Sequence, residues 1–219
     1  MKNQFESLDK SVFSRSVTEL TNLDSHLAEI VDRYGSPPLW VREPGFPTLV
    51  YIILEQQDSL ASAKAAFDRL NVAVRPLLTP RGFLKLTDAD LLRIGFSRQK
   101  TLYTRLLAES LSRRHFDLRY LHELHDDAAR KMLTAFKGIG NWTADIYLLS
   151  ALRRPDIWPV GDLALAAAVQ EVKHLRHRPS PERLEKLSQS WRPYRAVAAR
   201  LFWHAYLSKR GQNSVTISL

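Results

Sequence analysis

Residues 133–144 read Leu-Thr-Ala-Phe-Lys-Gly-Ile-Gly-Asn-Trp-Thr-Ala, and this stretch decides the fold. Two glycines, Gly138 and Gly140, flank Ile139. Apolar residues recur at helical spacing on both sides, as Ala128, Ala129, Met132, Leu133 and Phe136 before the glycines and as Ala144, Tyr147, Leu148 and Ala151 after them. Since glycine enters backbone conformations closed to other residues, the pattern predicts a helix, a tight glycine hairpin and a second helix.

The backbone amides of such a hairpin lie at a helix amino terminus, where they suit a phosphate oxygen. A plain helix connection that needs glycine for its turn explains the two glycines as well. A G-x-G pair is weak evidence alone, and here it lacks the preceding strand of a dinucleotide-binding fold.

The stretch resembles the helix-hairpin-helix motif of a superfamily of DNA glycosylases, in which a loop with proline or glycine and then an aspartate follow the hairpin. Here that loop is Asp156-Ile157-Trp158-Pro159-Val160-Gly161-Asp162. The continuation Trp191-Arg192-Pro193-Tyr194-Arg195 is most similar to the 3-methyladenine DNA glycosylase II (AlkA-like) branch. The resemblance covers about residues 45–207 and is strongest over 133–204.

The periodicity is helical almost throughout, and together with the resemblance it predicts an all-α, two-lobed fold with the active-site cleft between the lobes. We expect one domain over residues 1–219, with a central helical lobe at about 45–125. Residues 1–44 and 126–209 would form the hairpin lobe, and 210–219 a polar tail. Among the helix starts, Thr87 to Asp90 predict a capping box and Ser97 a second cap.

The composition favours a polyanionic partner, because 32 Lys and Arg against 23 Asp and Glu give a net charge of +9. Basic proteins without a nucleic-acid role are also common. The chain has no cysteine, which excludes disulfides, cysteine-ligated zinc and an iron–sulfur cluster. The amino terminus is no signal peptide and no apolar run is long enough for a membrane span, so we expect a cytoplasmic, nucleoid-associated protein.

The resemblance identifies Asp162 as the catalytic carboxylate, which would stabilise the positive charge that develops on the sugar as the base leaves. The alternative is structural, because aspartate is a favoured residue at the start of a helix, and a helix is predicted from Leu163. The two roles are compatible. Asp145 and Asp156 are the other acids nearby, and for Asp145 a structural bond is the better interpretation.

Aromatic residues gather in the last third of the chain, and their ring faces attract cations such as a methylated purine. The family match favours Trp142, Trp191 and Tyr194 as walls of a base pocket, with Trp158 as a further candidate, whereas core packing explains any single one. Glycosylases that also cut the strand carry a lysine two residues after the second hairpin glycine. This chain has Trp142 there, which implies a monofunctional enzyme.

The sequence Ile-Leu-Glu-Gln-Gln at 53–57 resembles the family's segment at the gap left by a flipped nucleotide. By that match Gln57 is the wedge and Gln56 its neighbour facing the widowed strand; a polar helix end on the surface is the alternative. Arg98 and Lys100, at the start of a predicted helix, are candidates for phosphate contact, and solvated charge explains them equally well.

The hairpin residues expected to bind a DNA phosphate are Lys137, Gly138, Ile139, Gly140, Asn141 and Thr143. In related proteins a monovalent cation bridges hairpin carbonyls and a phosphate; the matching carbonyls here belong to Thr134, Phe136 and Ile139, so Na⁺ or K⁺ is an expected structural ion. No other metal and no small-molecule cofactor is expected. Some relatives have two adjacent aspartates in the catalytic loop, where this chain has Gly161 before Asp162.

The resemblance, supported by the charge and the aromatic residues, implies a monomeric enzyme of base excision repair. It would flip alkylated purines, such as 3-methyladenine and 7-methylguanine, out of double-stranded DNA and hydrolyse their N-glycosidic bond. The alternative is a protein of the same fold that grips damaged DNA without cutting it.

Overall fold

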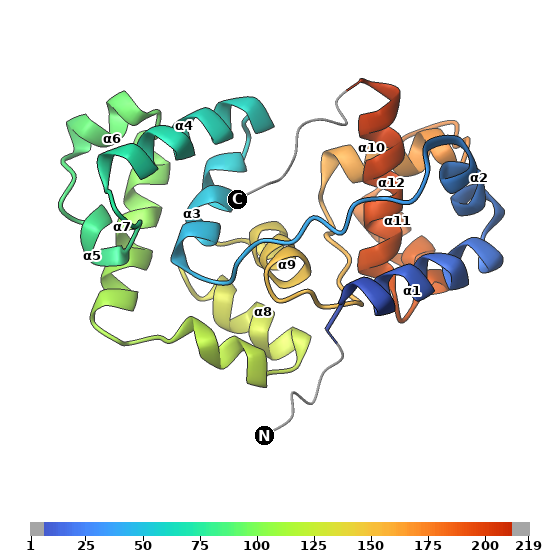
Figure 1. The fold of residues 1–219 in the computed structure, drawn as a ribbon, viewed down its shortest axis with the longest axis horizontal. Helices are drawn as coiled ribbons and strands as arrows, with labels where there is room; N and C mark the ends of the chain where they lie inside the picture. Colours follow the sequence, from blue (N-terminus) through green and yellow to red (C-terminus); the bar gives the residue numbers. More distant parts are fainter. Residues whose placement is uncertain (1–6, 212–219) are drawn as a thin grey trace. The chain divides into compact units, whose positions relative to one another are not determined.

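The computed structural model describes residues 7–211, and in that range it contains helices and no strand (Figure 1). The all-α prediction is therefore confirmed for the described residues. The part of the expected tail at 212–219 lies outside them. The chain divides into two compact units, which comprise residues 43–147 and, among the described residues, 7–42 with 148–211. The hairpin segment 126–147 thus groups with the 45–125 helices, whereas the sequence suggested the other lobe. The cleft expected between the lobes stays a prediction.

The first unit is built on α3 (Phe46–Glu55), whose residues are all buried except Pro47. This helix is apolar around its circumference, which is typical of a helix inside a core. It packs against α4 (Leu60–Ala73) and α7 (Arg98–Ser112). The short helices α5 (Pro80–Phe83) and α6 (Asp88–Ile94) complete this part, where the ring of Phe83 contacts Phe46 edge-on and Phe96 at a tilt.

Two predicted helix starts in this unit are confirmed. Thr87 and Asp90 form a capping box in which each side chain bonds to the other's backbone amide, and Gly95 ends α6 in the left-handed conformation. The Ser97 side chain accepts from the amide of Lys100 and caps α7. The Ser97 cap fixes where α7 begins, and α7 carries Tyr103, which contacts the hairpin at Gly138.

The rest of the first unit carries the hairpin. A 3₁₀ helix, η1 (Leu118–Glu123), leads into α8 (Asp126–Thr134), and α9 (Asn141–Ser150) follows the two glycines, as the sequence predicts. The division between the units falls within α9. Phe116 and Phe136 pack together under the hairpin, with ring centroids 5.1 Å apart.

The second unit is organised around α12 (Arg195–Lys209), which packs against α1 (Lys10–Leu23), α2 (Ser25–Tyr34) and α10 (Leu163–Val172). Helix α11 (Pro181–Ser188) and the 3₁₀ helix η2 (Gln189–Trp191) close the unit. Figure 1 shows α10, α12 and α2 side by side, as their contacts require.

Arg200 lies wholly inside this second unit. Its guanidinium donates to the carbonyls of Leu39, Leu149 and Ala196 at 2.7, 2.8 and 2.9 Å. Burial lowers the Arg200 pKa to about 9. The amino-terminal segment is therefore bonded into the core of this unit. Among the described residues no helix is long and apolar enough to cross a membrane.

Candidate nucleic-acid interface and reaction site

The hairpin after α8 has the backbone geometry that its glycines predict. Gly138 takes a φ of 92°, and the Ile139 amide donates to the Phe136 carbonyl at 3.0 Å. The Ile139 side chain turns inward and is 4% exposed, while Lys137, Gly140 and Asn141 are exposed. The Lys137 side chain and the backbone at Gly140 and Asn141 are therefore accessible to a phosphate, and the buried Ile139 side chain anchors the turn.

There is also no room for a side chain at Gly138. A Cβ atom built on it would lie 2.1 Å from Cγ of Tyr103 in α7. The Tyr103 hydroxyl in turn accepts from Nε2 of Gln99 at 2.7 Å. The hairpin therefore contacts α7 directly at Gly138, where the hairpin has no side chain.

The predicted wedge segment forms the turn after α3. Gln57 is exposed and has a φ of 57°, a left-handed conformation that is uncommon for a non-glycine residue. Gln56 is half-buried, and its Nε2 donates to the Gly138 carbonyl at 2.9 Å and to Thr143 Oγ1 at 2.8 Å. The fold thus brings Gln56, a predicted strand-facing residue, into contact with two predicted hairpin residues.

Lys100 does not occupy the position expected of a phosphate-binding residue. It is 8% exposed, and its Nζ donates to the Leu54 carbonyl at 2.7 Å and to Asp58 Oδ2 at 2.6 Å. The phosphate contact proposed for Lys100 is therefore wrong, because the fold directs this ammonium to the end of α3. Arg98 is exposed at the start of α7, as a phosphate contact would require.

Asp162 is the residue before α10, and its side chain caps that helix. Its Oδ1 accepts from the Leu165 amide at 2.6 Å and from Nε1 of Trp203 at 3.4 Å. The carboxylate is half-buried, and Gly161 before it is exposed with a φ of 90°. Negative charge at a helix amino terminus is favourable, so the position suits an anionic carboxylate.

The two neighbouring acids are occupied in structural pairs. Asp145 is 2% exposed and accepts from Nε of Arg130 at 2.7 Å, which agrees with the structural bond predicted for it. Asp156 accepts from Nε and Nη2 of Arg195 at 2.8 and 3.0 Å. Asp162, which accepts from a backbone amide and an indole, stays the candidate that the family resemblance identifies.

The aromatic residues proposed for the base pocket fall into two groups. Trp158 and Trp191 are core residues, 3% and 1% exposed, and they pack against each other and against Phe202. The indole of Trp191 donates to Asp24 at 2.9 Å. These positions do not support pocket walls, because neither ring face is open to a ligand. Trp142 and Tyr194 are half-buried and keep accessible surface.

Trp203 contacts the candidate carboxylate, and the preferred pocket set did not include it. It lies on α12, half-buried, with its indole N–H directed at the Asp162 carboxylate. The sequence signal was the aromatic enrichment of the last third. Helical periodicity alone could not separate Trp203 from its buried neighbour Phe202.

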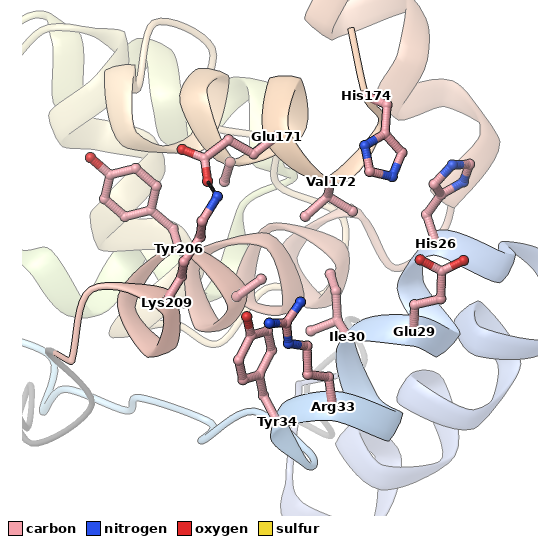
Figure 2. Close-up of a pocket in the computed structure, with 12 residues that line it drawn as sticks. His26, Glu29, Ile30, Arg33, Tyr34, Glu171, Val172, His174, Tyr206 and Lys209 are labelled. Carbon is pink, nitrogen blue, oxygen red and sulfur yellow. Dashed lines mark hydrogen bonds and ion pairs between the residues drawn. The ribbon is translucent and has the colours of Figure 1, made fainter.

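A shallow pocket of about 180 Å³ lies elsewhere in the second unit, between α2, the end of α10 and α12 (Figure 2). None of the predicted site residues lines it. Its rim carries the ion pair between Glu171 and Lys209, 2.9 Å apart, and the rings of Tyr34 and Tyr206. It is therefore distinct from the Asp162 site.

Comparison with known proteins decides the family. Residues 50–193 match the family described as the HhH-GPD superfamily of base excision DNA repair proteins, which is most of the described chain and includes the hairpin, Asp162 and Trp191. The chain belongs to the HhH-GPD superfamily. The superfamily prediction made from the hairpin and its following loop is thereby confirmed.

Several HhH-GPD relatives align over nearly their whole length. A crystal structure of a DNA-3-methyladenine glycosidase from Bacillus halodurans superposes with a TM-score of 0.73 at 26% identity, covering 97% of both chains. The fission yeast protein mag2, named an alkylbase DNA glycosidase-like protein, is 24% identical over 209 residues, which are 92% of this chain and 98% of mag2.

A Bacillus subtilis relative, YfjP, provisionally named a DNA-3-methyladenine glycosylase, is 25% identical over 186 residues. That match spans 82% of this chain but only 65% of YfjP. The names of these HhH-GPD relatives agree with the branch that the Trp191 to Arg195 segment predicts.

Proposed function

We propose that the protein is a monofunctional DNA glycosylase that removes alkylated purines, such as 3-methyladenine and 7-methylguanine, from double-stranded DNA. The observation that carries the proposal is Asp162, a half-buried carboxylate held at the amino end of α10 in a chain of this superfamily. The names of its relatives support the same class of substrate.

Asp162 is suited to stabilise a cationic sugar. The bonds from Leu165 and Trp203 fix the orientation of its Oδ1, so little reorganisation is needed when charge develops. As the bond between C1′ and the purine nitrogen breaks, its electron pair leaves with the alkylated base, which becomes neutral without receiving a proton. Water then forms the new bond to C1′ and loses a proton, which leaves an abasic site.

Trp142 supports hydrolysis rather than strand cleavage. Strand-cutting relatives carry a lysine at the matching position, where its amine forms a Schiff base with the sugar. An indole cannot form that intermediate. We therefore expect the reaction of this protein to end at the abasic site.

The first unit would hold and open the duplex. Lys137, Gly140 and Asn141 present charge and backbone to a phosphate, and Gln57 projects from its turn as the wedge. Na⁺ or K⁺ at the hairpin carbonyls belongs to the same proposal. The Phe136 carbonyl accepts one backbone bond and keeps a second lone pair, so it is compatible with such an ion.

Selectivity for alkylated purines would come from ring faces that attract their positive charge, by up to about 2 kcal/mol when desolvated. Trp142, Tyr194 and Trp203 keep partly accessible rings and are our candidates. A monomer that acts on chromosomal DNA in the cytoplasm fits this reaction.

One observation favours a second candidate function. The 2.6 Å bond from the Leu165 amide gives Asp162 a structural role in capping α10, so the residue has a reason to be present even in a protein that performs no chemistry. The alternative is therefore a non-catalytic protein that binds damaged DNA.

The decisive experiment compares the wild-type protein with Asp162→Asn on DNA treated with a methylating agent, with released bases measured by chromatography. Asparagine caps a helix about as well as aspartate but carries no charge. We expect release to fall by about 10²–10³-fold while DNA binding is retained. Asp156→Asn, which breaks a structural pair with Arg195, is the matched control and should keep the activity of the folded fraction.

Base release by Asp162→Asn at the wild-type rate would refute the mechanism. Tight binding of methylated DNA by the wild-type protein with no released base would instead establish the non-catalytic binder.

A further inference from the structure

One side chain, that of Gln56, links two loops by hydrogen bonds: the turn that carries the proposed wedge and the hairpin proposed to bind a phosphate. We propose that Gln56 is a positioning residue that couples these two DNA-contacting loops, so that the hairpin's grip on DNA and the insertion of Gln57 occur together. The inference rests on the proposed function, since it assigns DNA contacts to both loops.

The hydrogen bonds of Gln56 define this role. A backbone carbonyl only accepts, so the group facing Gly138 at 2.9 Å must be the amide NH₂ of Gln56. The same nitrogen donates to Thr143 Oγ1 at 2.8 Å, and Thr143 is 2% exposed. Both donors of the half-buried Gln56 amide are therefore directed to the hairpin and to the start of α9.

Gln56 also fixes a single peptide group of the hairpin. The peptide between Gly138 and Ile139 is held at its carbonyl by Gln56 and at its amide by the Phe136 carbonyl, at 3.0 Å. The orientation of this peptide sets the path of the chain into Gly140 and Asn141. Loss of the Gln56 bond would therefore loosen the hairpin and the wedge turn at the same time.

Helix α7 supports both loops from behind. Lys100 bonds to the Leu54 carbonyl and to Asp58 on either side of the wedge turn, and Tyr103 lies against Gly138. Gln57, in its left-handed conformation, lies in the chain between Leu54 and Asp58, the two residues that Lys100 contacts, and directly follows Gln56. The turn that carries Gln57 is thus held in place by contacts with α3, α7 and the hairpin.

The sequence suggested a different role for Gln56, in which its amide reads the strand opposite the flipped nucleotide. The two roles make different predictions. If Gln56 reads the opposite strand, the effect of substituting it should depend on the base opposite the lesion and should not depend on Thr143. A positioning residue should act through Thr143 and regardless of the opposite base.

The test uses the full chain and DNA duplexes that carry 2-aminopurine next to an abasic-site analogue. The fluorescence of 2-aminopurine rises when the base stack around it is opened. We expect Gln56→Ala to lower the opened fraction about tenfold, as the loss of one to two buried hydrogen bonds would. Binding of undamaged duplex, which uses the hairpin but not the wedge, should fall by a smaller factor. Gln189→Ala, a glutamine that bonds to Glu185 on α11, is the matched control and should leave both quantities unchanged.

Thr143 supplies the second arm. Thr143→Val removes one acceptor at nearly constant volume and should lower the opened fraction about threefold, and Thr143→Ser should restore it. In the Gln56→Ala background, Thr143→Val should cause no further loss, because the bond it removes is already absent.

Three results would overturn the coupling role: additive effects of Gln56→Ala and Thr143→Val, a Gln56→Ala effect that changes with the opposite base, or a loss that follows the melting temperature of the variants. A wild-type protein that opens the duplex but releases no base would refute the proposed glycosylase activity and leave this fluorescence test valid.

Discussion

Trp191 and Trp203 lie twelve positions apart, on η2 and on α12, yet their surroundings give them different roles. Trp191 is 1% exposed and its indole N–H serves Asp24. Trp203 is half-buried and its indole N–H faces Asp162. Both are tryptophans in the aromatic-rich last third of the chain, so only the burial and the bonding partner distinguish the core residue from the candidate site residue.

Trp191→Phe should therefore affect folding and not chemistry. The substitution removes a hydrogen bond to a charged group, and we expect the free energy of unfolding to fall by about 1.5–3 kcal/mol. Urea unfolding measures this loss, and single-turnover base release by the folded protein should be unchanged. A selective fall in the rate of release would return Trp191 to the base pocket.

Trp203→Phe should show the opposite pattern. The ring is kept while the N–H directed at Asp162 is lost, and because the 3.4 Å contact is long, we expect about a tenfold decrease in the rate of base release. Binding to an abasic-site duplex should change little. If the single-turnover rate stays at the wild-type value, Trp203 does not orient the carboxylate.

At the scale of elements, the hairpin depends on one glycine more than on the other. Gly138 combines a φ of 92° with contact to Tyr103, whereas a Cβ on Gly140 would meet nothing within 4 Å. We expect Gly138→Ala to lower the free energy of unfolding by about 1–3 kcal/mol from backbone strain, with a further cost for moving Tyr103. Gly140→Ala, the matched control, should stay within about 0.5 kcal/mol of the wild type. Equal losses in denaturant unfolding would contradict this assignment.

Helix α2 begins at a half-buried ionic cluster of Asp24 and Lys173. Burial raises the Asp24 pKa, but the hydrogen bonds from Lys173 and Trp191 outweigh it and hold the pKa below 3.8. Because the folded-state pKa is the lower one, the stability contributed by Asp24 is present above about pH 4 and is lost as the pH falls below it.

Asp24→Asn tests this cluster. Near neutral pH we expect the free energy of unfolding to fall by about 1.5–3 kcal/mol, because the half-buried Lys173 ammonium loses its charged hydrogen-bond partner. The difference between the wild type and Asp24→Asn should shrink in unfolding curves recorded toward about pH 3. A difference that does not change with pH would show that the ionised carboxylate contributes nothing.

At the scale of the whole molecule, the net charge of +9 should make duplex binding depend steeply on salt, because cationic side chains displace counterions from phosphates. If Lys137 neutralises one phosphate, Lys137→Gln should reduce the slope of log K against log salt by about 1 and leave the preference for one DNA sequence over another unaffected. Titrations at several salt concentrations measure the slope, and an unchanged value would remove Lys137 from the interface.

Local signals in the sequence predicted much of this molecule. The capping box at Thr87, the cap at Ser97 and the helices on both sides of Gly138 are encoded by neighbouring residues, and all were found where predicted. Contacts between distant residues were not predictable in this way. Gln56 meets the hairpin across 82 positions, and Lys100 reaches Asp58 across 42.

The burial of Arg200 has a practical consequence for efforts to reduce the protein to a minimal enzyme. A fragment that starts near residue 43 would keep the hairpin, the wedge and Asp162 but lose the Leu39 carbonyl that receives the Arg200 guanidinium. The guanidinium would keep its bonds to Leu149 and Ala196, but its buried Nε–H would lose its acceptor. Shortening the chain from its amino end should therefore give an insoluble product, since the same cut also removes α1 and α2, which pack against α12.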